Sequence, residues 1–181
     1  SKVYEEMMSA QPVTVEERKY DVQCSDEGYV YFYHNVPFSN FWKCGSQLQF
    51  DGHSFNCSEA VFMYQKALLF NDKEYALKIV ETDNSTSFKS QDDRCKAVKK
   101  LGRKVRGFVQ EEWDSKCYGL MYNAVECKAK YDMEFKRVLL SPEYAEKTFV
   151  EATRLDKIWG IGISIKKAME VGRAGWKGQN L

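Results

Sequence analysis

The chain has 181 residues, a formal net charge of +1, and 44% hydrophobic and 14% aromatic residues. This length fits one domain with a sizeable hydrophobic core, or one domain preceded by a short arm. The nearly balanced charge argues against a protein dedicated to nucleic-acid binding. No run of 18 apolar residues occurs, so we expect neither a transmembrane helix nor a membrane partner.

Cysteine and histidine usage bears on metal binding and on cellular compartment. The six cysteines include no C-x-x-C pair, and only two histidines occur. This inventory is poor for a structural zinc site, so we expect no metal and no cofactor. The first residues lack the pattern of a signal peptide. We therefore expect reduced cysteines and a cytoplasmic or nuclear location.

The first third of the chain predicts an arm followed by short strands. Residues 1–28 are mixed and polar, and we expect an N-terminal arm with one short helix. Residues 29–34 are rich in β-prone side chains and predict a strand. Two weaker strands at 47–50 and 53–55 are predicted to pair through a turn at Asp51-Gly52.

From Asn56 onward, apolar groups recur at helical spacing. Asn56-Cys57-Ser58-Glu59 has the form of a capping box, which predicts a helix from there to about Phe70. Further segments are predicted as helices at 72–80, 92–106, 111–131 and 133–140, a polar loop at 81–90, a short strand at 149–152, a loop at 156–165 and a short helix from Lys166. The fold class is therefore mainly α, a compact helical domain with a small β element near the N-terminus.

Glu59 and Lys66 are the first candidate catalytic pair. They are seven residues apart, so they lie on one face of a helix that is otherwise apolar almost all round and should be buried. Burial lowers the pKa of a lysine, and a neutral amine attacks aldehyde or imine carbons, while Glu59 could move protons. The alternative is that Glu59 only closes the capping box and Lys66 only reaches the surface. The pattern alone favours this alternative.

Two loops combine aromatic and polar residues. Ser39 and Asn40 stand between Phe38 and Phe41, which suits hydrogen bonding to a planar ring between aromatic faces, or else a turn over the edge of the core. The second loop spans residues 156–162.

Asp156 precedes Trp159, Gly160 and Gly162. A carboxylate can bind ribose hydroxyls, and glycines let the backbone approach a ligand closely. The spacing is not a G-x-G-x-x-G fingerprint, so no dinucleotide-binding fold of that type is predicted. The alternative is a glycine-rich turn with Trp159 in the core.

A basic stretch lies between residues 94 and 106. Its members are Arg94, Lys96, Lys99, Lys100, Arg103, Lys104 and Arg106. They could hold a pyrophosphate or a nucleic-acid strand, but for most of them we favour the solvated face of an amphipathic helix. Arg103, directly after Gly102, is the best candidate for a phosphate contact.

Taken in order, these motifs resemble the NADAR family, also called the YbiA-like family, over residues 30–181. The matching pieces are Phe32-Tyr33, Phe38-Ser39-Asn40-Phe41, Gly52, Ser58-Glu59, Gln65-Lys66, Gly102-Arg103, Trp113, Val150-Glu151, Asp156, Trp159-Gly160, Gly162 and Gly178-Gln179-Asn180-Leu181. Two departures occur. Ala60-Val61 replaces the aromatic pair that often follows the helix glutamate. The family motif also continues past Leu181, so we expect either a shortened chain or a variant end there.

The resemblance implies an N-glycosidase pocket in a catalytic domain at 29–181. Family members hydrolyse early intermediates of riboflavin synthesis, or remove ADP-ribose from guanine in nucleic acids or nucleotides. The implied catalytic residues are Lys66, Glu59 and Asp156. The implied substrate-binding residues are Phe32, Tyr33, Ser39, Asn40, Phe41, Arg103, Trp113, Trp159, Gly160 and Asn180.

We expect a substrate containing ADP-ribose, most plausibly ADP-ribosylated guanine in DNA or RNA, because the basic stretch suits a longer phosphate chain or a strand. The riboflavin intermediates and a non-catalytic module that binds ADP-ribose or NAD are the alternatives. In one mechanism Lys66 forms a Schiff base with the opened ribose and Glu59 moves the protons. In the other, Glu59 or Asp156 activates water directly.

Overall fold

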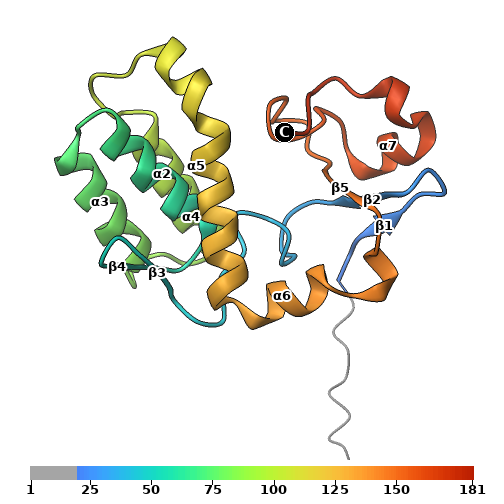
Figure 1. Cartoon of the computed structure of the whole chain (residues 1–181), viewed down its shortest axis with the longest axis horizontal. Helices are drawn as coiled ribbons and strands as arrows, with labels where there is room; N and C mark the ends of the chain where they lie inside the picture. Colours follow the sequence, from blue (N-terminus) through green and yellow to red (C-terminus); the bar gives the residue numbers. More distant parts are fainter. Residues whose placement is uncertain (1–19) are drawn as a thin grey trace, which may run out of the picture.

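The computed structural model describes residues 20–181 (Figure 1). The helices are α2 (Ser58–Leu69), α3 (Lys73–Asn84), α4 (Gln91–Gly102), α5 (Gln110–Tyr131), α6 (Met133–Leu139) and α7 (Ile165–Val171), with short 3-10 turns η1 (Pro142–Tyr144) and η2 (Arg173–Gly175). The strands are β1 (Gln23–Cys24), β2 (Tyr29–Phe32), β3 (Leu48–Phe50), β4 (His53–Phe55) and β5 (Thr148–Glu151). The predicted fold class, mainly α with a small β element, is confirmed.

The predicted arm is only partly described. Residues 20–28 contain β1 and no helix, and the remainder of the arm, where a short helix was expected, lies outside the described residues. β1 pairs antiparallel with β2. Within residues 20–181, no helix is both long and apolar enough to cross a membrane.

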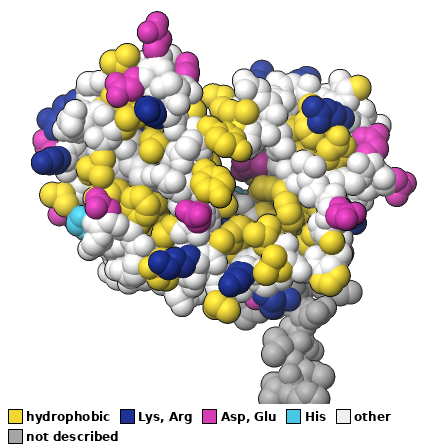
Figure 2. Space-filling view, viewed as in Figure 1, with side chains coloured by type: hydrophobic (Ala, Val, Ile, Leu, Met, Phe, Trp, Pro, Cys, Tyr) yellow, Lys and Arg dark blue, Asp and Glu magenta, His cyan; other side chains and the backbone are white. Residues whose placement is uncertain are grey.

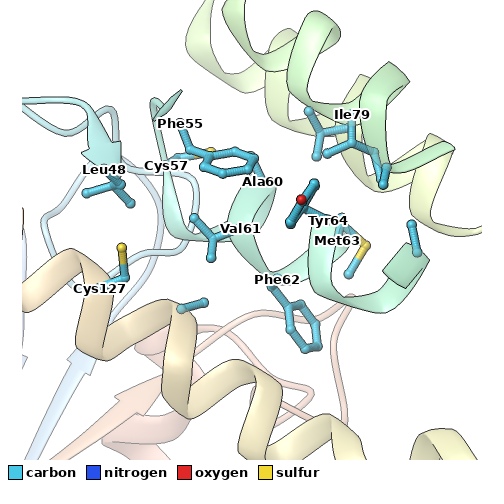
Figure 3. Close-up of a cluster of buried hydrophobic side chains, with 14 of the residues drawn as sticks. Leu48, Phe55, Cys57, Ala60, Val61, Phe62, Met63, Tyr64, Ile79 and Cys127 are labelled. Atoms are coloured by element: carbon cyan, nitrogen blue, oxygen red, sulfur yellow. The ribbon is translucent and has the colours of Figure 1, made fainter. Parts of the chain in front are cut away.

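Helix α2 forms the centre of the main core. Figure 1 shows α2, α3 and α4 together on one side of the molecule, with α5 running along them. Because α2 is apolar almost all round, it can be packed on every side. Figure 3 shows side chains from α2, the β3–β4 hairpin, α3 and α5 meeting in this core, among them Leu48, Phe55, Ala60, Val61, Phe62, Met63, Tyr64 and Ile79.

A three-stranded sheet lies on the other side of the molecule, with strand order β1-β2-β5. β2 and β5 are parallel, with Phe32 opposite Glu151, although more than a hundred residues separate them. Parallel neighbouring strands need a crossover connection. Here the crossover contains helices α2 to α6, which form the helical part of the protein. One sheet face packs on α7 through Val150 and Ala168, and the other face packs on Val138 and its neighbours.

Three local predictions were wrong. Helix α4 ends at Gly102 rather than continuing to residue 106, because the N–H of Arg106 donates to Asp72 instead of to a helix carbonyl.

The cap residue of α2 is Cys57 and makes no side-chain cap hydrogen bond, so the Asn56–Glu59 capping box does not form. Instead, the Asn56 N–H donates to Oδ2 of buried Asp83 at 2.6 Å. Helix α3 also continues to Asn84 rather than ending near residue 80. Near its end, Asp83 accepts the Asn56 N–H just before α2, and Asn84 donates to the Ser54 carbonyl of β4. These hydrogen bonds stabilise helical structure where the composition predicted a loop.

Gly102 allows α4 to approach α2 closely. An added Cβ would lie 2.0 Å from Sδ and 3.0 Å from Cγ of Met63, which is itself buried. The last turn of α4 therefore packs so closely on α2 that a side chain at this position would require the Met63 side chain to move.

Lys128 of α5 is 1% exposed and supports the loop after β2 from within the protein. Its Nζ donates to the carbonyl oxygens of Pro37 and Ser39, the latter at 2.8 Å, and lies 4.4 Å from the centre of the Phe135 ring. Burial lowers the pKa of Lys128 to about 8 because the charged amine loses its hydration.

Gly102→Ala should destabilise the protein by about 1–3 kcal/mol, the usual cost of overpacking. Chemical denaturation measures this free energy. Met63→Ala opens the space that the new methyl group needs, so adding Gly102→Ala to that background should cost much less. Equal costs in the two backgrounds would contradict the close α2–α4 contact.

Lys128→Met should change how stability depends on pH. Between pH 8 and 10 the folded wild type has lost the Lys128 proton while the unfolded chain still holds it, so stability rises with pH by up to about 1.4 kcal/mol per unit relative to the variant. Denaturation curves at several pH values test this. The exposed control Lys130→Met should follow the wild type, and parallel curves for Lys128→Met would refute the buried charge.

Candidate active site

A cavity of about 570 Å³ lies between the helical part and the sheet. Figure 2 shows a hollow there, ringed largely by hydrophobic side chains and with acidic side chains at its depth. The lining includes Tyr33 and His34, which follow β2, and Glu151, which ends β5. The cavity therefore lies off the carboxyl ends of the two parallel strands, a common place for ligand sites in sheets with parallel strands.

Four carboxylates line the cavity: Glu59 from α2, Asp92 from α4, Glu151 from β5 and Asp156 from the following loop. Among residues 20–181, no group of three or more His, Cys, Asp or Glu side chains is arranged to hold a metal ion. Carboxyl groups at a cavity can transfer protons and can form hydrogen bonds with a ligand.

Glu59 is held in the first turn of α2 and is 4% exposed. Its N–H donates to the Asn40 carbonyl at 3.1 Å, while its Oε1 is buried and has no hydrogen-bond partner among the described residues. Burial raises the pKa of Glu59, and the positive charges of Lys99 and Arg103 partly oppose this. An unpartnered buried carboxyl oxygen beside a cavity is available to a ligand or a water.

Glu151 and Asp156 are fixed differently. Burial raises the pKa of Glu151 to about 7, and the negative charge of Asp156 adds to the effect. Asp156 organises its own loop, because its Oδ1 accepts the N–H groups of Ile158 and Trp159 at 2.9 Å each. Its Oδ2 lies 3.9 Å from Lys99 Nζ. One carboxyl oxygen of Asp156 is thus structural and the other faces the charged groups of the site.

Helix α4 contributes the positive charges. Lys96, Lys99 and Arg103 lie along one face of α4 and its C-cap, and all three line the cavity. Lys96 pairs with Asp92, which also lies 3.2 Å from His34. Arg103 makes no ion pair with any residue in 20–181 and is exposed, so its guanidinium is available to an anion.

The loop after β2 presents Ser39, Asn40 and Phe41 to the cavity. Asn40 is locked in place, since its Oδ1 accepts from Ser58 Oγ at 2.8 Å and its Nδ2 contacts Met121 Sδ at 3.4 Å. Ser39 Oγ accepts the Phe41 N–H at 3.2 Å. These residues therefore form a turn and also line the cavity.

Lys66 lies beside the cavity rather than among the residues that line it. Its Nζ lies 4.7 Å from the centre of the Phe108 ring and 4.8 Å from that of Trp113. Burial and the charge of Arg103 lower the pKa of Lys66, while Glu59 opposes the shift. Lys66 and Glu59 therefore stand on one helix and each favours the charged form of the other, without an ion pair between their side chains.

The structure brings eight of the thirteen predicted site residues to the cavity. They are Glu59, Asp156, Tyr33, Ser39, Asn40, Phe41, Arg103 and Trp159. The others support it: Phe32 packs on Phe38, and Trp113 shields Lys66. Gly160 packs against the Glu151 carbonyl, and Asn180 Oδ1 accepts the Glu151 N–H at 3.1 Å.

Several lining residues were not singled out as site residues from the sequence: His34, Asp92, Lys96, Lys99, Met121, Glu151, Thr153 and Leu155. Glu151 stood in the Val-Glu motif, which was the available signal. Lys96 and Lys99 share a helical spacing with Arg103, but the sequence favoured a solvated face for most of this stretch.

Comparison with known proteins places the chain in a family. The sequence profile of the NADAR domain matches residues 31–181. N-glycosidase R617 of Acanthamoeba polyphaga mimivirus is 35% identical over 124 residues, which are 68% of this chain and 66% of the viral protein. Protein irg-1 of Caenorhabditis elegans is 35% identical over 130 residues, 70% of this chain and 55% of that protein.

The chain thus spans just under two thirds of the viral relative and about half of the nematode one. The NMR structure of the Escherichia coli protein YbiA is similar in fold, with a TM-score of 0.57, 24% identity and coverage of 81% of each chain. Because the family profile spans most of the sequence, the chain belongs to the NADAR domain family.

Proposed function

We propose that this protein is an N-glycosidase that hydrolyses the bond between a ribose anomeric carbon and an exocyclic amine. The observation that carries the proposal is Glu59, a buried carboxyl group with an unpartnered oxygen in a cavity of about 570 Å³. A polar group left unpaired in this way is costly to folding, and such costs are typical of functional sites. The N-glycosidase name of the viral relative supports the same activity.

The proposed substrate is ADP-ribosylated guanine, in nucleic acid or as a nucleotide. Support comes from the two signs of charge that line the cavity. Arg103, which is exposed and makes no ion pair within residues 20–181, suits a phosphate, and the carboxylates suit ribose hydroxyls and a leaving amine. Trp159 and Phe41 offer aromatic surfaces for a base or sugar.

In the proposed mechanism Lys66 is the nucleophile. The ribose opens to an imine, Lys66 Nζ attacks that carbon, and the base amine departs, after which water releases the sugar from the Lys66 imine. The lowered pKa of Lys66 increases the fraction of neutral amine. The attack requires Nζ to leave the Phe108 and Trp113 rings and enter the cavity, a movement within the reach of a flexible lysine side chain.

A second route needs no covalent step. Glu59 accepts a proton from water, which attacks an oxocarbenium-like ribose while Asp156 holds its hydroxyls. The specific observation that favours this route is that Glu59 and Asp156 line the cavity, whereas Lys66 lies beside it.

Glu59→Gln should lower kcat on an oligonucleotide carrying ADP-ribosylated guanine by at least about 100-fold, the usual contribution of a proton-transferring group. Loss of the modification, followed by mass spectrometry, measures this rate. Glu111→Gln, an exposed substitution on α5, is the matched control and should keep the wild-type rate. Wild-type protein that binds the oligonucleotide stoichiometrically but releases no product would instead indicate a binding module.

Lys66→Ala should abolish turnover and also the protein adduct that sodium borohydride traps from the wild type. The reduced imine adds the mass of ADP-ribose less one oxygen atom to a peptide containing Lys66, because imine formation releases water and the reduction adds two hydrogens. Lys116→Ala, at an exposed position of α5, should retain both rate and adduct. Product release without any adduct would contradict the covalent route and favour direct attack by water. Turnover only of phosphorylated ribosylaminopyrimidines, as in riboflavin synthesis, would correct the substrate.

A further inference from the structure

Glu151 combines a fixed backbone with an unpartnered carboxyl group. Its N–H donates to Asn180 Oδ1 at 3.1 Å, and its carbonyl accepts the Ile161 N–H at 3.0 Å. The side chain lines the cavity, yet within residues 20–181 its carboxyl oxygens make no hydrogen bond and no ion pair. The side chain is only partly buried, so the carboxyl group can meet a ligand in the cavity. The backbone anchors therefore hold the residue while its carboxyl group stays available.

The charges that face Glu151 differ from those that face Glu59. The pKa of Glu151 is raised by burial and by two carboxylates, Asp156 and Glu59, and only Lys99 opposes these effects. The pKa of Glu59 is raised by burial and Asp156, but Lys99, Arg103 and Lys66 all oppose them. Glu151 is therefore the acid whose neighbours favour its neutral form, and Glu59 the one whose neighbours favour its anion. Environments that differ in this way divide acid and base roles between two carboxyl groups.

We propose that Glu151 is the proton donor of the reaction and protonates the exocyclic nitrogen as its bond to the anomeric carbon breaks. This inference rests on the proposed N-glycosidase function and applies to both routes. The electron pair of the breaking bond stays on the nitrogen, and the Glu151 proton moves there, so the amine leaves neutral. One water is consumed in completing the hydrolysis. Its hydroxyl group goes to the sugar carbon, and its remaining proton, accepted by Glu59, returns to the Glu151 carboxylate.

The test is the pH dependence of the single-turnover rate on the ADP-ribosylated oligonucleotide. The wild-type rate should fall about tenfold per pH unit above about pH 7, as Glu151 loses its proton. Glu151→Gln should be at least about 100-fold slower at pH 6.5 and should lack this alkaline limb. Glu151→Asp, which can still donate a proton, should keep the limb. The exposed control Glu143→Gln should reproduce the wild-type profile.

Retention of both the rate and the alkaline limb in Glu151→Gln would overturn the assignment. A second measurement does not require turnover: carbon NMR of side-chain-labelled glutamate in the wild type, assigned with Glu151→Gln, should show this carboxyl group titrating near pH 7. Titration in the ordinary carboxyl range would also overturn the assignment. If the wild type turns over no ribosyl-amine substrate while Glu151 still titrates near pH 7, the proposed N-glycosidase function is wrong. The role of Glu151 as its proton donor is then wrong as well.

Discussion

The burial of Glu59 is the constraint on which the rest of this structure depends. A carboxyl oxygen without a partner inside a protein costs free energy, and the surrounding packing must offset that cost. Helix α2 meets the requirement because its other side chains are apolar almost all round and are enclosed by three helices and a hairpin. The Asn40 carbonyl takes up the Glu59 N–H, so the backbone is satisfied while the side chain stays unpartnered.

The parallel pairing of β2 and β5 completes the site from the far end of the chain. It places Glu151 and the Asp156 loop opposite the first turn of α2, although these segments are remote in sequence. The same pairing fixes Tyr33 and His34 at the neighbouring strand end. Buried Lys128 then secures the intervening loop through the Pro37 and Ser39 carbonyls. The cavity therefore forms only when the helical part and the sheet are both folded.

Local patterns predicted most of the elements, and non-local contacts explain the failures. The apolar side chains almost all round α2 indicated correctly that Glu59 and Lys66 share a buried helix. The capping box failed because Asp83, from α3, takes the Asn56 N–H. Lys99 was assigned to a solvated face because a helix face that lines a cavity has the same polar composition as one that faces water. Glu151 was missed because its surroundings come from α2, α4 and a loop, which no sequence spacing reveals.

Lys99 lowers the pKa of two carboxyl groups in this site and also reduces the repulsion between the carboxylates. It is the cation that acts on both glutamates, lowering the pKa of each, and its Nζ also lies 3.9 Å from Asp156. Without a shared positive charge, three carboxyl groups around one cavity would repel one another whenever two of them ionised. Lys99 stands on the same helix as Gly102, which lets α4 lie directly against Met63 of α2. The close helix contact is therefore part of the electrostatics of the site as well as of its packing.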